Sequence, residues 1–216
     1  MAQPVAAERS GPEGQALRLR GSERSKPFLS HPFRRKKLQP RPLTIHATAI
    51  LALVAARPTA ESLVSGLPLV AAGQALRLWA TGHLRKTRDL SVTGPYAFMR
   101  HPLYAGAFAI GCGFALMAGP RVARFVLPLG FAFFCLYYLP RKESIEAERL
   151  TAAHGAAYRT YRAQVGALLP RLRPWRPPPP GEPARWSLAR VLDNNEQSTL
   201  AWVLVATAAL LAKWWL

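Results

Sequence analysis

The chain has 216 residues, of which half are hydrophobic, yet it carries a formal net charge of +18. Long apolar runs alternate with Arg-rich connectors, whereas a soluble domain interleaves apolar and charged residues at helical or strand spacing. A nucleic-acid-binding protein can be equally basic, but it does not need uncharged stretches of membrane-spanning length. The composition therefore predicts an integral membrane protein with a lipid bilayer, and no nucleic acid, as its partner.

Residues 1–42 contain ten Lys and Arg residues and no apolar segment. We expect them to form a disordered basic tail without a signal peptide, followed by one membrane domain over 43–216. Cys112 and Cys135 both lie inside apolar runs, outside any metal-ligand spacing or disulfide pattern. They therefore predict neither a metal site nor a disulfide framework.

Five apolar runs predict an all-α, polytopic bundle of about five transmembrane helices, with cytoplasmic helices after the fourth. The first run is short for a span of about 20 residues. A proline-rich connector over 170–183 is expected to be extended and stiff. The apolar runs cover 43–56, 62–79, 103–118, 122–139 and 199–216.

The basic residues predict the orientation. The tail 1–42 has ten Lys and Arg residues, the connector 83–100 has four, and the segment 141–198 has ten, which is 24 of the 29 in the chain. Five spans place these three segments on the same side of the membrane, and basic loops favour the cytoplasm. We therefore expect a cytoplasmic N-terminus and a cytoplasmic catalytic side, in the inner membrane of a bacterium.

The stretch 94–106, GPYAFMRHPLYAG, stands before the third apolar run. Its Gly-Pro predicts a turn, and the proline after His101 keeps that residue out of helical geometry. Pro102 suits the first position of a helix, whose N-terminus favours anions. Arg100, His101 and Tyr104 fall in the same turn, and ionisable residues at the end of a membrane helix indicate function. The alternative is that Arg100 and His101 only reach toward the interface while Tyr104 anchors the helix.

This stretch resembles the signature of the isoprenylcysteine carboxyl methyltransferase and phospholipid methyltransferase superfamily, as does the preceding GQALRLWATGHLRKTRDLSVT. Downstream, the family has a Glu-Glu pair, a Leu, Gly-x-x-Tyr-x-x-Tyr and a Pro. The resemblance covers about 71–170 and departs at Ala147, where the second acid is missing; Glu143 and Glu148 are nearby but out of register. The matching residues here are Glu146, Leu150, Gly155, Tyr158, Tyr161 and Pro170.

The resemblance implies an integral membrane methyltransferase that transfers a methyl group from S-adenosylmethionine to a lipophilic substrate. It implies Glu146 and His101 as catalytic residues. The expected cofactor-binding residues are Arg100, His101, Pro102, Leu103, Tyr104, Gly106, Glu146 and Gln74, and the expected substrate-binding residues are Arg77, Tyr158, Tyr161 and Arg162.

The residue types suit such a cofactor. A carboxylate such as Glu146 can accept hydrogen bonds from ribose hydroxyls or an ammonium, and aromatic faces suit an adenine ring and a cation. Tyr158, Tyr161 and Arg162 share a face if 156–167 is helical, and Glu146 and Leu150 share one on a helix over about 142–153. The alternatives are an amphipathic helix on anionic lipid and, for Arg77, a side chain that only reaches the interface.

Methyl transfer from a sulfonium depends mainly on proximity, because the methyl group is already activated. A carboxylate acceptor, as in the isoprenylcysteine enzymes, needs no general base. A phospholipid amine must lose a proton, to Glu146 or His101. The alternatives from other classes are an NADPH-dependent membrane reductase and a non-enzymatic basic membrane anchor.

Overall fold

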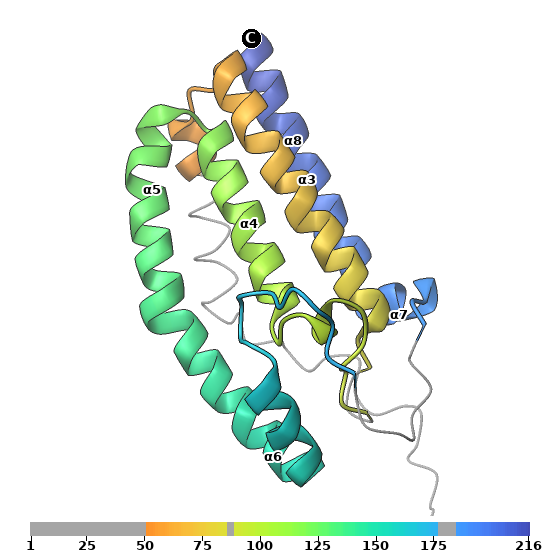
Figure 1. Ribbon diagram of the computed structural model, residues 1–216. Helices are drawn as coiled ribbons and strands as arrows, with labels where there is room; N and C mark the ends of the chain where they lie inside the picture. Colours follow the sequence, from red (N-terminus) through yellow and green to blue (C-terminus); the bar gives the residue numbers. More distant parts are fainter. Residues whose placement is uncertain (1–50, 86–88, 177–184) are drawn as a thin grey trace, which may run out of the picture. The chain divides into compact units, whose positions relative to one another are not determined.

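The computed structural model describes residues 51–85, 89–176 and 185–216, and the described chain is helical, without β-strands (Figure 1). The expected basic tail 1–42 and half of the connector 170–183 lie outside the described residues. A 3₁₀ turn, Gly94–Ala97, precedes α4, and a π-helical turn, Phe134–Tyr138, joins α5 to α6. The helices are α3 (Ala60–His83), α4 (Pro102–Met117), α5 (Pro120–Phe133), α6 (Leu139–Gln164), α7 (Leu188–Asp193) and α8 (Glu196–Trp215).

Three helices in the described part of the chain are long and apolar enough to cross a membrane. They are α3, the continuous helix Pro120–Gln164 that begins with α5, and α8. The predicted third span corresponds to α4, which is apolar but has only 16 residues. The predicted first span lies mostly outside the described residues, and only 51–55 are seen as a helix. The all-helical membrane class is therefore supported, with three spans where five were expected.

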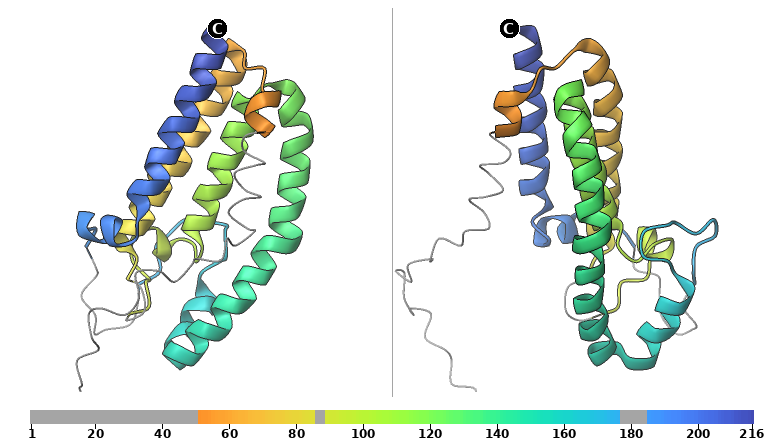
Figure 2. Two further views of the ribbon diagram at one scale, coloured as in Figure 1. Left: turned by 180° about the vertical axis from the view of Figure 1, so that it is seen from behind. Right: turned by 90° about the vertical axis from the view of Figure 1, so that its left-hand side faces the viewer.

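Helices α3 and α4 pack side by side at two pairs of glycines (Figures 1 and 2). Gly66 of α3 lies against Gly113 of α4, and Gly73 lies against Gly106. A Cβ atom added at Gly73 would lie 2.7 Å from the Gly106 carbonyl oxygen, and one at Gly113 would lie 2.8 Å from the Gly66 carbonyl oxygen. Small residues let helix backbones approach closely where lipid provides no hydrophobic driving force between helices.

The segment that leads into α7 caps the C-terminal end of α3. The last four carbonyls of a helix have no partner within it. Here the indole of Trp186 donates to the Leu78 carbonyl at 3.1 Å, the guanidinium of Arg190 donates to Gly82 at 2.7 Å, and the amide of Asn194 donates to Thr81 at 3.0 Å. A cation at this end also suits the helix dipole. These contacts place the start of α8 beside the end of α3.

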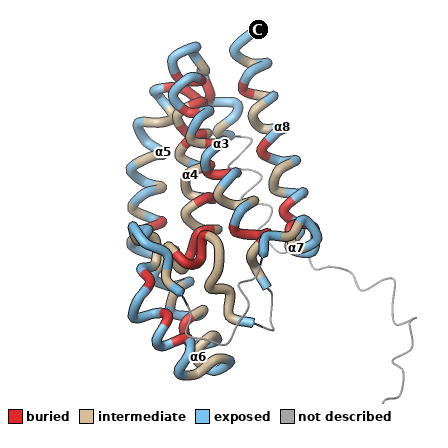
Figure 3. Tube along the Cα trace, turned by 45° about the vertical axis from the view of Figure 1, so that its right-hand side comes forward, coloured by how far each residue is buried: buried red, intermediate tan, exposed pale blue. Residues whose placement is uncertain are grey.

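Helix α6 bends back on itself at Gly155, whose φ of 53° interrupts the helix (Figure 2). The break lies where the sequence predicted it, between the expected helices 142–153 and 156–167. The two halves enclose a cluster of buried residues; Figure 3 colours buried residues red along the chain. The cluster contains Ala147, Tyr158, Tyr161 and Val165.

The chain then returns along the segment before α4 as a strap, which we define as residues 165–175. Its backbone pairs with that segment: Arg171 N–H donates to the Phe98 carbonyl at 3.0 Å, and Trp175 N–H donates to the Ala97 carbonyl at 2.9 Å. The phenol of Tyr161 donates to the Tyr96 carbonyl at 2.7 Å. The approach to α4, the strap and α6 are thus fixed together at one end of the helices.

The glycine pairs generate the first prediction. We expect Gly113→Ala to lower the free energy of unfolding by about 1–3 kcal/mol, because its Cβ atom would press on the backbone of α3, which cannot move cheaply. Gly111→Ala on the same helix is the matched control, because a Cβ atom there meets nothing within 4 Å. Denaturant unfolding of the purified protein in detergent measures both. Equal losses in the two variants would contradict the close approach.

Candidate functional site

A cavity of about 560 Å³ lies between the approach to α4 and the helix α6. We call it the polar cavity. One wall comes from the end of α3 and the approach to α4, with Leu84, Arg85, Asp89, Leu90, Ser91, Tyr96 and Arg100–Tyr104. The other comes from α6, with Glu146, Arg149, Leu150, Ala153, His154, Tyr158 and Tyr161. The structure brings together eight of the residues that the sequence singled out: Arg100, His101, Pro102, Leu103, Tyr104, Glu146, Tyr158 and Tyr161 all line it.

Glu146 is the central acid of this cavity. It lies two turns into α6, and its carboxylate accepts a hydrogen bond from the phenol of Tyr104, which lies in the first turn of α4. The other carboxylate oxygen lies 3.4 Å from Nδ1 of His101. The His101 and Tyr104 rings stack with their centroids 5.3 Å apart. Residues 42 or more positions apart in sequence therefore form one acid–imidazole–phenol cluster.

The backbone around His101 is held by the strap. Arg100 N–H donates to the Gly166 carbonyl at 2.9 Å, and His101 N–H donates to the Ala167 carbonyl at 3.0 Å. His101 has φ −121° and ψ 56°, and α4 begins directly after it with Pro102. The prediction that the proline keeps His101 out of the helix is confirmed. This conformation turns the imidazole toward Glu146 and leaves only 5% of the side chain exposed.

Arg100 pairs with Glu143, one helical turn before the buried Ala147. Arg162 also approaches Glu143, with 3.6 Å between nitrogen and oxygen. Tyr158, Tyr161 and Arg162 were predicted to share a face of the helix. Tyr158 and Tyr161 line the polar cavity, but Arg162 does not. Ala147 packs in the cluster inside the bend of α6. Glu143 therefore contacts Arg100 from outside the polar cavity, which it does not line.

Four residues that line the cavity also hold buried polar atoms without a hydrogen-bond partner in the described structure. They are the Tyr96 and Tyr158 hydroxyls, Arg100 Nε and His101 Nε2. Burial raises the pKa of the Tyr96 phenol, which therefore stays protonated as a donor. An unsatisfied buried polar group costs about 1–3 kcal/mol. Their concentration around one cavity indicates a ligand with polar groups.

The cavity carries one cation that no carboxylate of the described chain neutralises. Arg85 pairs with Asp89 at 2.8 Å, and Arg100 pairs with Glu143. Arg149, which also lines the cavity, has no carboxylate within ion-pair distance among the described residues. A ligand in the cavity could therefore have both a cationic part at Glu146 and an anionic part at Arg149.

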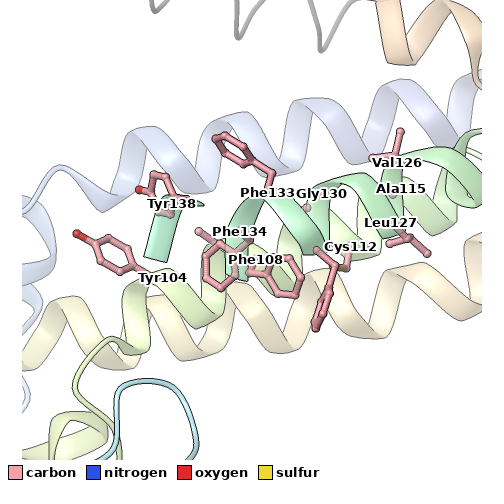
Figure 4. A pocket seen from close by; sticks show the side chains of 13 residues that line it. Tyr104, Phe108, Cys112, Ala115, Val126, Leu127, Gly130, Phe133, Phe134 and Tyr138 are labelled. Carbon is pink, nitrogen blue, oxygen red and sulfur yellow. The ribbon is translucent and has the colours of Figure 1, made fainter. Parts of the chain in front are cut away.

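An apolar groove of about 330 Å³ adjoins the cavity and runs between α4 and α5 (Figure 4). Tyr104 lines both the groove and the polar cavity. At this end, the Tyr104 and Tyr138 rings meet edge to face with their centroids 5.7 Å apart. Beyond them, the rings of Phe108 and Phe134 stack at 4.4 Å. Tyr138 belongs to the π-helical turn, a feature that is frequent at functional sites.

Besides Arg162, three predicted site residues lie outside both spaces. Arg77 forms two hydrogen bonds of 2.8 Å to the carboxylate of Glu196 at the start of α8, and Gln74 donates to the same carboxylate at 3.2 Å. Gly106 faces Gly73 and Arg77. Arg77 also donates to the Leu103 carbonyl at 3.3 Å, so it supports a residue of the cavity wall. These residues hold α3, α4 and α8 together.

The sequence analysis missed several residues of the site. Tyr96 is part of the motif but was given no role, and Arg149, His154 and Tyr138 were not singled out. Glu196 could have been found as an acid at the start of an apolar helix, since a charge there needs a partner and Arg77 is the one basic residue between 62 and 79.

The Arg77–Glu196 pair generates the second prediction. Only 2% of the Glu196 side chain is exposed, and removing one partner of a buried ion pair costs about 3–5 kcal/mol. We expect Glu196→Gln to lower the free energy of unfolding by about 3 kcal/mol, whereas Glu61→Gln, at an exposed position of α3, has little effect.

The double variant Arg77→Met/Glu196→Leu separates structural support from ligand binding. It removes both charges and should recover most of the lost stability. If Arg77 instead bound substrate, the double variant would be stable but would have lost substrate affinity.

Comparisons with known proteins give no relative on which to base a function. No protein-family model, curated protein or solved structure matches the chain. The function is therefore inferred from the site itself: an acid–imidazole–phenol cluster in a polar cavity, next to an apolar groove between α4 and α5.

Proposed function

We propose that the protein is a membrane methyltransferase that transfers a methyl group from S-adenosylmethionine to a lipophilic substrate. One observation carries the proposal: the polar cavity and the apolar groove share Tyr104, which donates to Glu146. A polar ligand and a lipophilic ligand can thus meet at one point. Methyl transfer needs this arrangement, because the reaction depends on proximity and alignment more than on covalent help from the protein.

The side chains of the polar cavity fit the cofactor group by group. Glu146 suits the ribose hydroxyls or the ammonium, and Arg149 suits the carboxylate. Leu90, Leu150 and Tyr158 offer apolar and aromatic surface for the adenine ring. The unpartnered Tyr96 and Tyr158 hydroxyls supply further donors. Arg100 fits a different role, since its pairing with Glu143 fixes the turn that presents His101.

In the proposed reaction, the methyl carbon bonds to an oxygen of the acceptor while its bond to sulfur breaks, and the sulfur keeps the electron pair. The protein holds the two reactants in line and excludes water. His101 and Tyr104 keep Glu146 directed into the cavity through their contacts with its carboxylate. A carboxylate acceptor brings no proton to remove, so this cluster needs only to position the reactants.

A prenyl-like thioether carboxylate is the proposed acceptor, because its chain matches the groove and its charge matches the basic cavity. Strongly exposed apolar residues flank the groove on α5, including Phe125 and Leu129, and they suit contact with lipid. The substrate would enter from the bilayer between α4 and α5. A phospholipid amine is the second candidate; it must lose a proton, and His101 beside Glu146 is the group that could accept it.

The proposed location is the cytoplasmic side of a bacterial inner membrane. The approach to α4, the bend of α6 and the start of α8 lie at one end of the helices (Figures 1 and 2). In the sequence, the segments 83–100 and 141–198, whose described parts include these elements, carry 14 of the 29 Lys and Arg residues. Basic segments at one membrane surface favour the cytoplasmic side.

The third prediction concerns cofactor binding. We expect Glu146→Ala and His101→Ala each to weaken the binding of S-adenosylmethionine at least about tenfold, because each removes hydrogen bonding around a charged group. Glu148→Ala is the matched control: it removes the same charge two residues away on α6, outside the polar cavity. Titration calorimetry of the purified protein in nanodiscs measures all four proteins, and thermal unfolding checks that they are folded.

The same titration with NADPH tests the alternative classes. Binding of NADPH in place of S-adenosylmethionine would support a membrane reductase. If the wild-type protein and the variants all bind neither compound, the result would support a basic membrane anchor and contradict the proposal.

The acceptor is identified by labelling. Membranes that contain either the wild-type protein or the Glu146→Ala variant are incubated with methyl-labelled S-adenosylmethionine and with lipid extracted from the same cells. A labelled, base-labile ester that depends on Glu146 would indicate a carboxylate acceptor. A labelled, base-stable methylamine would indicate a phospholipid amine.

A further inference from the structure

Two glycines that line the apolar groove pack against no neighbouring helix in the part of the chain that the structure describes. Gly111 lies on α4 and Gly130 on α5, and a Cβ atom added at either one meets nothing within 4 Å. The glycines of the α3–α4 contact are different, since a Cβ atom at Gly106 or Gly113 would press on the neighbouring helix. Glycine is among the least favourable residues inside a helix. Close helix packing, the usual reason for keeping it in a membrane span, does not apply at these two positions.

Both glycines lie at the same depth in the groove. On α4, Gly111 is seven residues beyond Tyr104. On α5, Gly130 is eight residues before Tyr138, which lies in the π-helical turn that follows α5. Two helical turns correspond to about 10 Å along each helix. Figure 4 shows Tyr104 and Tyr138 at one end of the groove, Phe108 and Phe134 in between, and Gly130 farther along. A chain whose polar head lies at Tyr104 would therefore reach the two glycines with its distal part.

The chemistry of the groove fits one occupant. Its lining is aliphatic and aromatic apart from the hydroxyls of Tyr104 and Tyr138 and the thiol of Cys112, and it contains no charged residue. The hydroxyls lie at the end that adjoins the polar cavity. A single hydrocarbon chain with one polar end matches this distribution of polarity.

We propose that Gly111 and Gly130 determine the chain length of the methyl acceptor, by leaving room in the groove for the distal part of one unbranched or isoprenoid chain. The inference rests on the proposed function, because the polar head of the chain must lie next to the polar cavity. A larger side chain at either position fills that room. The groove would then end about 10 Å from Tyr104 and accept only shorter chains.

The test compares Gly111→Leu and Gly130→Leu with wild type on two probes, N-acetyl-S-octylcysteine and N-acetyl-S-hexadecylcysteine. We expect each variant to lower kcat/KM for the hexadecyl probe at least about tenfold, the effect of excluding two or more methylenes, and to leave the octyl probe unchanged. Leu129→Phe is the control, because it adds bulk beside Gly130 at a residue that is 70% exposed and outside the groove. Equal losses on both probes, or no loss on either, would overturn the proposal.

A second measurement needs no methyl transfer. Cys112 lines the groove and Cys135 does not, and these are the two cysteines of the chain. We expect the hexadecyl probe to slow modification of Cys112 by a small neutral maleimide in wild type but not in Gly130→Leu, with Cys135 unaffected in both. This result would support the groove even if the protein transferred no methyl group. Protection of Cys112 by hexadecane as strong as that by the probe would indicate adventitious lipid and overturn the proposal.

Discussion

The close approach of α3 and α4 determines the arrangement of the rest of the molecule. Two glycine pairs, Gly66 with Gly113 and Gly73 with Gly106, fix the rotation of α4 about its axis. Since one face of α4 is committed to α3, another face, which carries Tyr104, is turned toward α5 and α6. Lipid offers no hydrophobic force to bring helices together, so close backbone contact is a main source of their order. The groove and the cavity both depend on this rotation.

The polar end of the structure depends on a second constraint, the bend of α6 at Gly155. The combination of φ 53° and ψ −122° at Gly155 lies in a region that glycine adopts readily and L side chains rarely do. The bend lets Tyr158 and Tyr161 pack back against Ala147 and carries the strap to the backbone of Arg100 and His101. Glu146 then meets His101 and Tyr104 in a cavity whose walls keep several polar atoms without partners. Such a cluster is costly without a polar ligand, which favours a binding role over a purely structural one.

The local structure of the site could be predicted from the sequence, because it follows from short-range rules. Proline geometry predicted the conformation of His101 and the start of α4. The pairing of Arg77 with Glu196 was not predicted, because 119 positions separate them and no local pattern specifies which membrane helices pack together. The apolar groove was not predicted for the same reason. Uniformly apolar helices give no periodicity that distinguishes a lipid-facing side from a substrate-facing side.

Tyr104 belongs to the wall of both the polar cavity and the apolar groove. A ligand that fixes its ring from one space changes the shape that the other space offers. If each space binds a ligand, the two binding events are therefore thermodynamically linked. Each ligand then changes the affinity for the other by the same factor. Under the proposed function, one shared side chain would let the helix bundle favour the ternary complex over either binary complex.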